Sequence, residues 1–126
     1  MEWRDIPGYE GFYQASSEGQ IRRTDTGLIL IPIKHTRGYY HVSLSTGSRA
    51  TVKKCLVHRL VAITFLGPPP IESAVVNHID GNKRHNAAAN LEWVTQGANV
   101  EHYFRMREER AFRANVRAHQ DDPIPW

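Results

Sequence analysis

One stretch decides the fold, residues 75–102, which reads VVNHIDGNKRHNAAANLEWVTQGANVEH. Two short apolar runs, residues 75–79 and 91–95, are separated by a loop that turns through Asp80-Gly81-Asn82, and this pattern predicts a β-hairpin. A helix is predicted to begin near Gln96, directly after the second run. The polar side chains of this stretch would then be held between rigid elements.

The last helix is predicted to extend from residue 96 to about residue 118. Its apolar positions share one face, and its arginines lie mostly off that face. The apolar positions are Val100, Phe104, Ala111, Phe112 and Val116, and the arginines are Arg105, Arg107, Arg110, Arg113 and Arg117. The tail, residues 119–126, is not helical in pattern.

A second helix is predicted upstream, at residues 56–66, where the sequence reads LVHRLVAITFL. Four residues recur at three-to-four spacing and should form its buried face: Leu56, Leu60, Ile63 and Thr64. The run Gly67-Pro68-Pro69-Pro70 cannot continue a helix and ends it.

The N-terminal half reads as a small antiparallel sheet. Residues 1–23 favour a short hairpin, and residues 28–33 form a second apolar run. Residues 40–45 alternate with period two, so one face should be buried and the other should carry His41 and Ser43. Residues 50–54 should pair back as a further strand. We therefore predict an α+β fold, with a small N-terminal sheet and helix, then a ββα core and a C-terminal helix.

The chain divides into three parts in this interpretation: an N-terminal β module at residues 1–54, a core with its two helices at 55–118, and a tail at 119–126. Neither half is large enough to fold well alone, so 126 residues make one unit. A net charge of +3 and a pI of about 9.2 favour an anionic partner.

A single cysteine, Cys55, excludes an internal disulfide and paired-cysteine zinc sites, and we expect a buried, inert thiol. No apolar run approaches the length needed to span a membrane, and the N-terminus has no signal-peptide pattern. We therefore expect a reducing, cytoplasmic setting and no membrane partner.

Residues 77–99 hold groups suited to cutting a phosphodiester. An imidazole such as His78 can take a proton from water near neutral pH. The amide oxygens of Asn77 and Asn99 are hard, neutral ligands suited to Mg²⁺ or Mn²⁺, and such a cation could stabilise the leaving oxygen. Because both ligands are neutral, we expect weak metal binding without substrate phosphate.

These residues resemble the ββα-metal core of HNH endonucleases, in the branch related to phage and intron-encoded homing endonucleases. The matching positions are 77–83, 86, 90–95 and 99, with 57–62 upstream. The N-terminal segment is similar to a NUMOD4-like module that often precedes this core, matched at 3–6, 8–11, 13, 16 and 19–23. The resemblance covers roughly residues 1–105.

The resemblance implies a role for each signature position. His78 matches the general base, and Asn90 matches a residue that braces the loop and orients the base. Asn99 matches a metal ligand, and Asn77 stands where several members carry a metal-binding Asp. That difference removes a negative charge from the ligands, which should reduce metal affinity and rate more than it changes the fold. Other side chains could serve in place of Asn77, ranked below it: Asp80, His85 and His102.

The remaining candidates have simpler interpretations. His58 and Arg59 lie on the upstream helix, where packing and a surface or DNA-backbone contact are favoured over metal binding. Trp93 is expected in the core. Basic side chains near recognisable family elements are candidates for phosphate contacts, with solvated surface as the alternative. They are Arg22, Arg23, Arg59, Lys83 and Arg84.

We therefore predict a DNA endonuclease that depends on Mg²⁺ or Mn²⁺ and, as the family implies, leaves 3′-hydroxyl and 5′-phosphate ends. Little chain follows the last helix, so weakly specific nicking or cutting is expected. Two alternatives stay open: a DNA-binding module that has lost activity, because position 77 is neutral, and a nuclease that serves a phage packaging assembly. The residues decide neither between nicking and double-strand cutting nor between a monomer and a homodimer.

Overall fold

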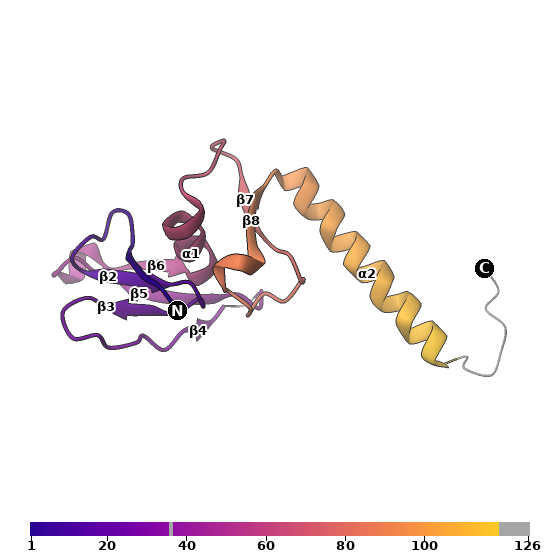
Figure 1. Cartoon of the computed structure of the whole chain (residues 1–126), viewed down its shortest axis with the longest axis horizontal. Coiled ribbons are helices and arrows are strands. Elements are labelled where there is room, and N and C mark those ends of the chain that lie inside the picture. Colours follow the sequence, from indigo (N-terminus) through magenta and orange to yellow (C-terminus); the bar gives the residue numbers. More distant parts are fainter. Residues whose placement is uncertain (36, 119–126) are drawn as a thin grey trace.

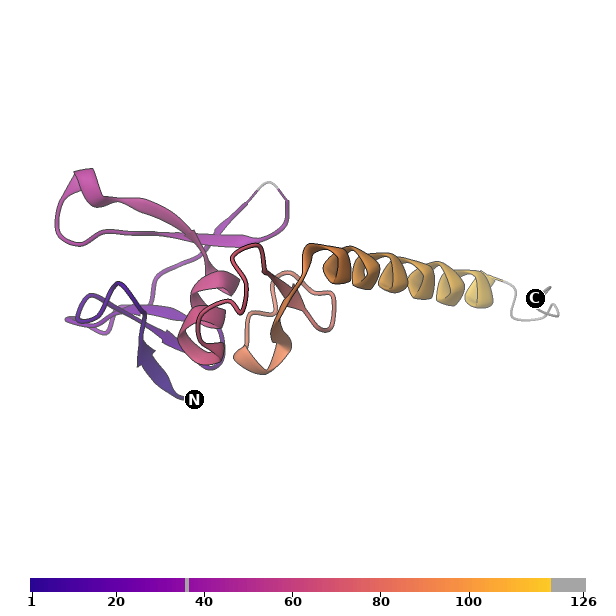
Figure 2. The same ribbon diagram turned by 90° about the horizontal axis from the view of Figure 1, so that it is seen from above.

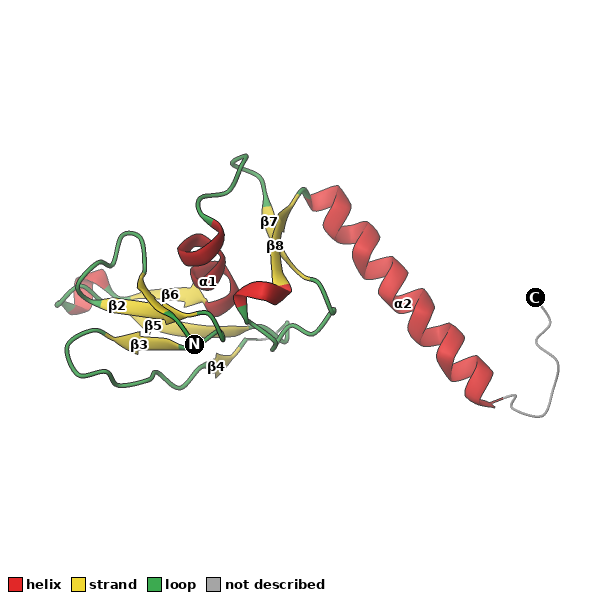
Figure 3. Ribbon diagram, in the orientation of Figure 1, coloured by secondary structure: helices red, strands yellow, loops and turns green. Residues whose placement is uncertain are grey.

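The computed structural model describes residues 1–35 and 37–118, the side chains of residues 49 and 109–118 excepted. Within this part of the chain there are three small antiparallel sheets and two α-helices, as Figures 1 and 3 show. The predicted α+β class is confirmed. The predicted tail at 119–126, and the side chains predicted to line the last helix beyond residue 108, lie outside the described residues.

The first sheet has the order β1-β2-β3 and consists of β1 (Trp3–Asp5), β2 (Tyr13–Ser16) and β3 (Ile21–Arg23). The predicted hairpin of residues 1–23 was therefore wrong by one strand. Gly8 and Gly11 have φ angles of 86° and 80° in the turn after β1, and residues other than glycine rarely adopt such positive φ angles. This turn brings the first strand back against β2, with Trp3 opposite Ser16.

The second sheet has the order β4-β5-β6: β4 (Ile33–Lys34), β5 (Tyr40–Leu44) and β6 (Lys53–Leu56). The predicted strand at residues 50–54 begins later than expected, because a 3₁₀ turn, η1 (Arg49–Thr51), comes first. The predicted apolar run at 28–33 contributes only its last residue, Ile33, which begins β4, and Ile31 is 87% exposed.

The prediction for β5 was half wrong. Ser43 is exposed as expected, but His41 is buried. His41 stands opposite Leu56 in β6 and lies edge-on to the ring of His35, with 6.0 Å between ring centroids. These neighbours cover His41, which the alternation of polar and apolar residues could not reveal.

Helix α1 (Val57–Leu66) ends at Gly67, as predicted. Its buried residues are Val57, His58, Leu60, Val61 and Ala62, so the expected face was right at Leu60. It was wrong at Ile63 and Thr64, which are half-buried, and at Leu56, which is half-buried and belongs to β6. The reason is that α1 packs against the β2, β5 and β6 strands on one side and against the hairpin that follows on the other.

That hairpin is formed by β7 (Val75–His78) and β8 (Leu91–Val94), with a short 3₁₀ turn, η2 (Ala88–Asn90), before β8. Helix α2 (Gln96–Ala118) follows at once and projects away from the rest of the molecule, as Figure 2 shows. These bounds agree with the predicted strands and helix to within one residue at the described ends. Asn77 pairs with Glu92, and His78 pairs with Leu91.

One hydrophobic cluster joins both halves of the chain. It includes Ile6 and Ala15 from the first sheet, Leu44 from the second, Val61 from α1 and Val76 from β7. The N-terminal sheets and the hairpin therefore share a core. Among the described residues, no helix combines the length and apolar character needed to cross a membrane.

Candidate active site

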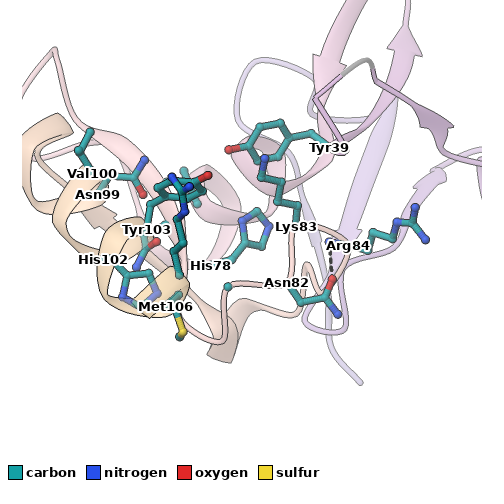
Figure 4. Close-up of a pocket in the computed structure, with 15 residues that line it drawn as sticks. Tyr39, His78, Asn82, Lys83, Arg84, Asn99, Val100, His102, Tyr103 and Met106 are labelled. Carbon is teal, nitrogen blue, oxygen red and sulfur yellow. Dashed lines mark hydrogen bonds between the residues drawn. The ribbon is translucent and has the colours of Figure 1, made fainter. Parts of the chain in front are cut away.

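A cleft of about 690 Å³ lies between the β7–β8 hairpin and helix α2. Its lining comes from four segments: residues 38–39 before β5, residues 76–78 of β7, the loop 81–84, and one face of α2 from Asn99 to Arg107. Figure 4 shows His78 between the loop that carries Asn82 and Lys83 and the helix that carries Asn99 and His102. The cleft thus gathers part of the residues that the sequence singled out: Asn77, His78, Lys83, Arg84, Asn99 and His102.

His78 is held at the floor of this cleft at the end of β7, and it is 5% exposed. Its Nε2 lies 2.8 Å from Oδ1 of Asn86. An amide oxygen only accepts hydrogen bonds, so Nε2 carries the proton and Nδ1 keeps its lone pair. Burial lowers the pKa of His78, and the hydrogen bond to Asn86 opposes that shift. A largely neutral imidazole with a free Nδ1 is the form required of a general base.

Two further rings pack beside His78. The ring of His58 lies 5.1 Å from that of His78, and the ring of Tyr39 stacks on His58 at 4.8 Å. Burial, followed by the charges of His78 and Arg59, lowers the pKa of His58 to about 3. His58 is therefore neutral at neutral pH.

Asn90 ties the ends of the loop together from η2. Its Oδ1 accepts a hydrogen bond from the backbone N–H of Asp80, and its Nδ2 donates to Asp80 Oδ1 and to the carbonyl of His85. The backbone carbonyl of Asn90 also accepts from the N–H of Ile79. Asn90 does not line the cleft, so any effect on chemistry would pass through the loop.

Asp80 is the charged centre of this loop. Burial by itself raises its pKa, but hydrogen bonds from His85, from the backbone of Asn82 and from Asn90 together lower the pKa to about 2. Nδ1 of His85 lies 2.7 Å from Oδ2 of Asp80, and both side chains are substantially exposed. Neither lines the cleft, which argues against their use as metal ligands in place of Asn77.

Three asparagines line the cleft, and two of them, Asn77 and Asn99, lie on opposite walls. Asn77 on β7 is 5% exposed and donates from Nδ2 to Glu92 Oε1 at 2.9 Å, which leaves its Oδ1 for another partner. Asn99 lies half-buried on the first turns of α2. Amide oxygens suit Mg²⁺ and Mn²⁺, so this donor set fits a divalent cation.

The charge of the lining bears on how firmly a cation would be held. Among the described residues that line the cleft, none is Asp or Glu, and no group of three or more His, Cys, Asp or Glu is gathered for metal binding anywhere in the described chain. Binding would therefore be weak until phosphate oxygens supply negative charge.

The predicted DNA-contacting residues fall into two groups. Lys83 and Arg84 line the cleft, and their cationic groups lie above the rings of Tyr39 and Tyr40 at 4.8 and 6.0 Å. The other three do not line it. Arg59 on α1 lies over the ring of Trp93, and Arg22 lies over the ring of Trp3. Arg23 forms an ion pair with Asp25.

Several site residues were not assigned roles from the sequence. Asn86 matched the family pattern, but nothing in its spacing showed that it would bond to His78. Tyr39 lies 39 positions before His78 in the sequence and reaches the cleft only through the fold. Arg107 lines the cleft because it lies two turns after Asn99 on α2, a periodicity that could have revealed it.

The fold and this arrangement define a class of protein. The family model described as HNH endonuclease matches residues 55–100, and the model of the NUMOD4 motif matches residues 1–45. The chain belongs to the HNH endonuclease family, whose members generally use a divalent metal ion.

Particular relatives narrow the comparison. The chain is 46% identical over 101 residues to DNA endonuclease I-HmuI of Bacillus phage SP01, which covers 80% of this chain and 56% of the relative. It is 42% identical over 103 residues to an HNH endonuclease of Acanthamoeba polyphaga mimivirus named as uncharacterised, covering 79% of this chain and 25% of the relative.

A solved structure of DNA binding and cleavage by the HNH homing endonuclease I-HmuI matches with a TM-score of 0.75 and 39% identity. The match covers 94% of this chain and 68% of that chain. The chain therefore spans little more than half the length of its phage relative and a quarter of its mimivirus relative.

Proposed function

We propose that this chain hydrolyses phosphodiester bonds of DNA, with His78 as the general base and a divalent cation, Mg²⁺ or Mn²⁺, held by Asn77 and Asn99. One observation carries the proposal: a buried histidine, in one cleft with the amides of Asn77 and Asn99, has its Nε2 engaged by Asn86, so Nδ1 is the ring nitrogen left to act as a base. The relatives named above, a phage DNA endonuclease among them, support the same reaction.

In this mechanism, Nδ1 of His78 removes a proton from water, and the resulting hydroxide attacks the phosphorus. The cation, when bound, stabilises the charge on the oxygen that leaves. Lys83 and Arg84 hold the phosphate backbone along the cleft, with Arg59, Arg22 and Arg23 as more distant contacts. The bond between phosphorus and the 3′-oxygen breaks, and the leaving 3′-oxygen takes up a proton from solvent, so the products are a 3′-hydroxyl and a 5′-phosphate. A phage-encoded enzyme of this kind would act in the cytoplasm of the host cell.

Asn90 acts indirectly in this scheme. Its three side-chain hydrogen bonds to Asp80 and His85 keep the loop closed, and the same loop carries Asn86, which holds His78. Removing Asn90 would therefore misplace the base without removing a reacting group.

The test uses supercoiled plasmid incubated with the full chain and Mg²⁺ or Mn²⁺, with EDTA in a parallel reaction. His78→Ala should lower cleavage by at least about 100-fold, because general-base catalysis contributes about that much, while a gel shift persists. His35→Ala is the matched control, because His35 is exposed and does not line the cleft. Normal cleavage by His78→Ala would refute the mechanism.

One observation favours a second candidate, a DNA-binding module with little activity: the cleft lining lacks a carboxylate among its described residues. Asn77→Asp distinguishes the two. If weak metal binding limits a working enzyme, this variant should cleave faster and at lower metal concentration. A salt-sensitive gel shift, with no cleavage by either form at any metal concentration, would favour the binding module.

A further inference from the structure

Three aromatic rings from three separate elements meet behind the cleft. Tyr39 precedes β5, His58 lies in the first turn of α1, and His78 ends β7. The ring centroids are 4.8 Å apart for Tyr39 and His58, 5.1 Å for His58 and His78, and 6.0 Å for Tyr39 and His78. These separations are those of rings in packing contact. His58 and Tyr39 therefore bound the space that the His78 ring occupies.

His58 brings a polar ring nitrogen into this buried stack. It is 8% exposed, and its Nδ1 is buried with no hydrogen-bond partner among the described residues. A buried polar nitrogen without a partner destabilises a fold, so phenylalanine or leucine would pack better at this position. What His58 provides to His78 is therefore the contact of its ring and not a hydrogen bond from Nδ1.

Among the described residues, Asn86 is the side-chain hydrogen-bond partner of the His78 ring. The hydrogen bond from Nε2 to Asn86 fixes one atom of the ring but allows the ring plane to tilt about that atom. Contact with the faces of other rings removes this freedom, and precise orientation of a reacting group raises the rate of its reaction.

We propose that His58 is a positioning residue that, together with Tyr39, holds the imidazole plane of His78 so that Nδ1 faces the cleft. The inference rests on the proposed function of His78. It also gives the N-terminal half a part in the chemistry, because Tyr39 lies in the loop directly before β5 of the second sheet and His58 lies in α1. The ammonium of Lys83 lies 4.8 Å above the Tyr39 ring and donates to the carbonyl of Arg37, which closes the outer side of the stack.

The first experiment compares two substitutions of His58 in the full chain by steady-state plasmid nicking. His58→Ala removes the ring and should lower kcat by roughly 10- to 100-fold, as expected for a misplaced base, while KM for DNA stays within about twofold. His58→Phe restores an apolar ring and should recover kcat to within about threefold of the unsubstituted chain. Equal impairment of both variants would overturn the proposal, since ring packing would not be the cause. A change confined to KM would also overturn it.

The second experiment does not depend on activity. Long-range ¹H–¹⁵N correlation NMR reports which nitrogen of His78 carries the proton. The unsubstituted chain and His58→Phe should show one species protonated at Nε2, and His58→Ala should show mixed or broadened His78 signals. Unchanged His78 signals in a folded His58→Ala variant would overturn the proposal.

If His58→Ala does not fold, two variants of Tyr39, Tyr39→Ala and Tyr39→Phe, provide the same test. Tyr39 is half-buried, so Tyr39→Ala should fold. It should give the mixed or broadened His78 signals that are expected of His58→Ala, and Tyr39→Phe should leave the His78 signals unchanged. Absence of any such difference would count against the ring stack. If His78→Ala cleaves normally, the proposed function fails, yet the NMR comparison still decides whether His58 holds the His78 ring.

Discussion

The two walls of the cleft are built in different ways. The hairpin wall, residues 75–94, buries Asn77, His78, Asn86 and Asn90. Side-chain hydrogen bonds join His78 to Asn86, Asn77 to Glu92 and Asn90 to Asp80. The helix wall, residues 96–107 of α2, is half-exposed: Val100, Tyr103 and Phe104 are 51%, 57% and 51% exposed.

This difference separates the two tasks of the site. The hairpin wall shares the hydrophobic core of the whole molecule, so the proposed base is fixed before any substrate arrives. The helix wall packs mainly against β7 and then leaves the body of the molecule, as Figure 1 shows. We therefore expect damage to the hairpin wall to reduce stability, and damage to the helix wall to reduce metal binding alone.

The largest loss of stability should follow a fall in pH, because His58, which packs against the hairpin wall, is buried in its neutral form. The pKa of His58 is about 3 in the folded chain against an ordinary value of 6.5, so between these pH values the unfolded chain binds a proton that the folded chain does not. The contribution of neutral His58 is therefore fully present above pH 6.5 and is lost as the pH falls. The free energy of unfolding should drop by about 3 kcal/mol from this residue between pH 7 and pH 4.

Denaturant unfolding at several pH values measures this drop, and His58→Phe is the comparison because it cannot take up the proton. The variant should lose less stability over the same range. Parallel pH profiles for the two chains would contradict a buried, neutral His58 and weaken the contrast between the walls.

A smaller loss of stability is expected from Gly19→Ala, because the added carbon would collide with the loop that carries Asn86. A Cβ at Gly19 would lie 2.7 Å from the backbone carbon and oxygen of Asn86, and φ there is 93°. Steric overlap and an unfavourable φ should together lower the free energy of unfolding by about 3 kcal/mol or less, and cleavage should fall because Asn86 moves.

Gly11→Ala isolates the backbone term, since Gly11 also has a positive φ of 80° but has nothing within 4 Å of the added carbon. It should lower the free energy of unfolding by only about 1 kcal/mol. Thermal or urea unfolding of both variants is the measurement. Equal losses would mean that the close approach to Asn86 has no energetic consequence.

The smallest effect on stability should follow from Asn99→Ala in the helix wall. Alanine favours a helix slightly more than asparagine, so the free energy of unfolding should change by no more than about 0.7 kcal/mol. Binding of Mn²⁺ in the presence of DNA should nevertheless weaken by roughly tenfold or more, as measured by electron paramagnetic resonance of free Mn²⁺. Gln96→Ala, on the same helix and outside the cleft, should bind Mn²⁺ unchanged. Unaltered Mn²⁺ binding by Asn99→Ala would remove Asn99 from the proposed ligands.

Local pattern was enough for most of the elements. The hairpin and the start of α2 were predicted to within one residue, because alternation of apolar residues, the Asp80-Gly81-Asn82 turn and the helix period are all local signals. Where several elements cover one residue, local pattern failed: β1 was missed, and His41 was expected on an exposed face.

For the site, the sequence by itself determined which groups are available: an imidazole at position 78, amides at 77, 90 and 99, and the spacing that places them in the HNH family. The tertiary structure alone decided that Asn86 bonds to Nε2 of His78 and that Tyr39 and His58 pack beside its ring. The physical reason is that the bond to Asn86 depends on how the loop between β7 and β8 folds back on β7. The ring contacts join the loop before β5, helix α1 and β7, which one shared core holds together.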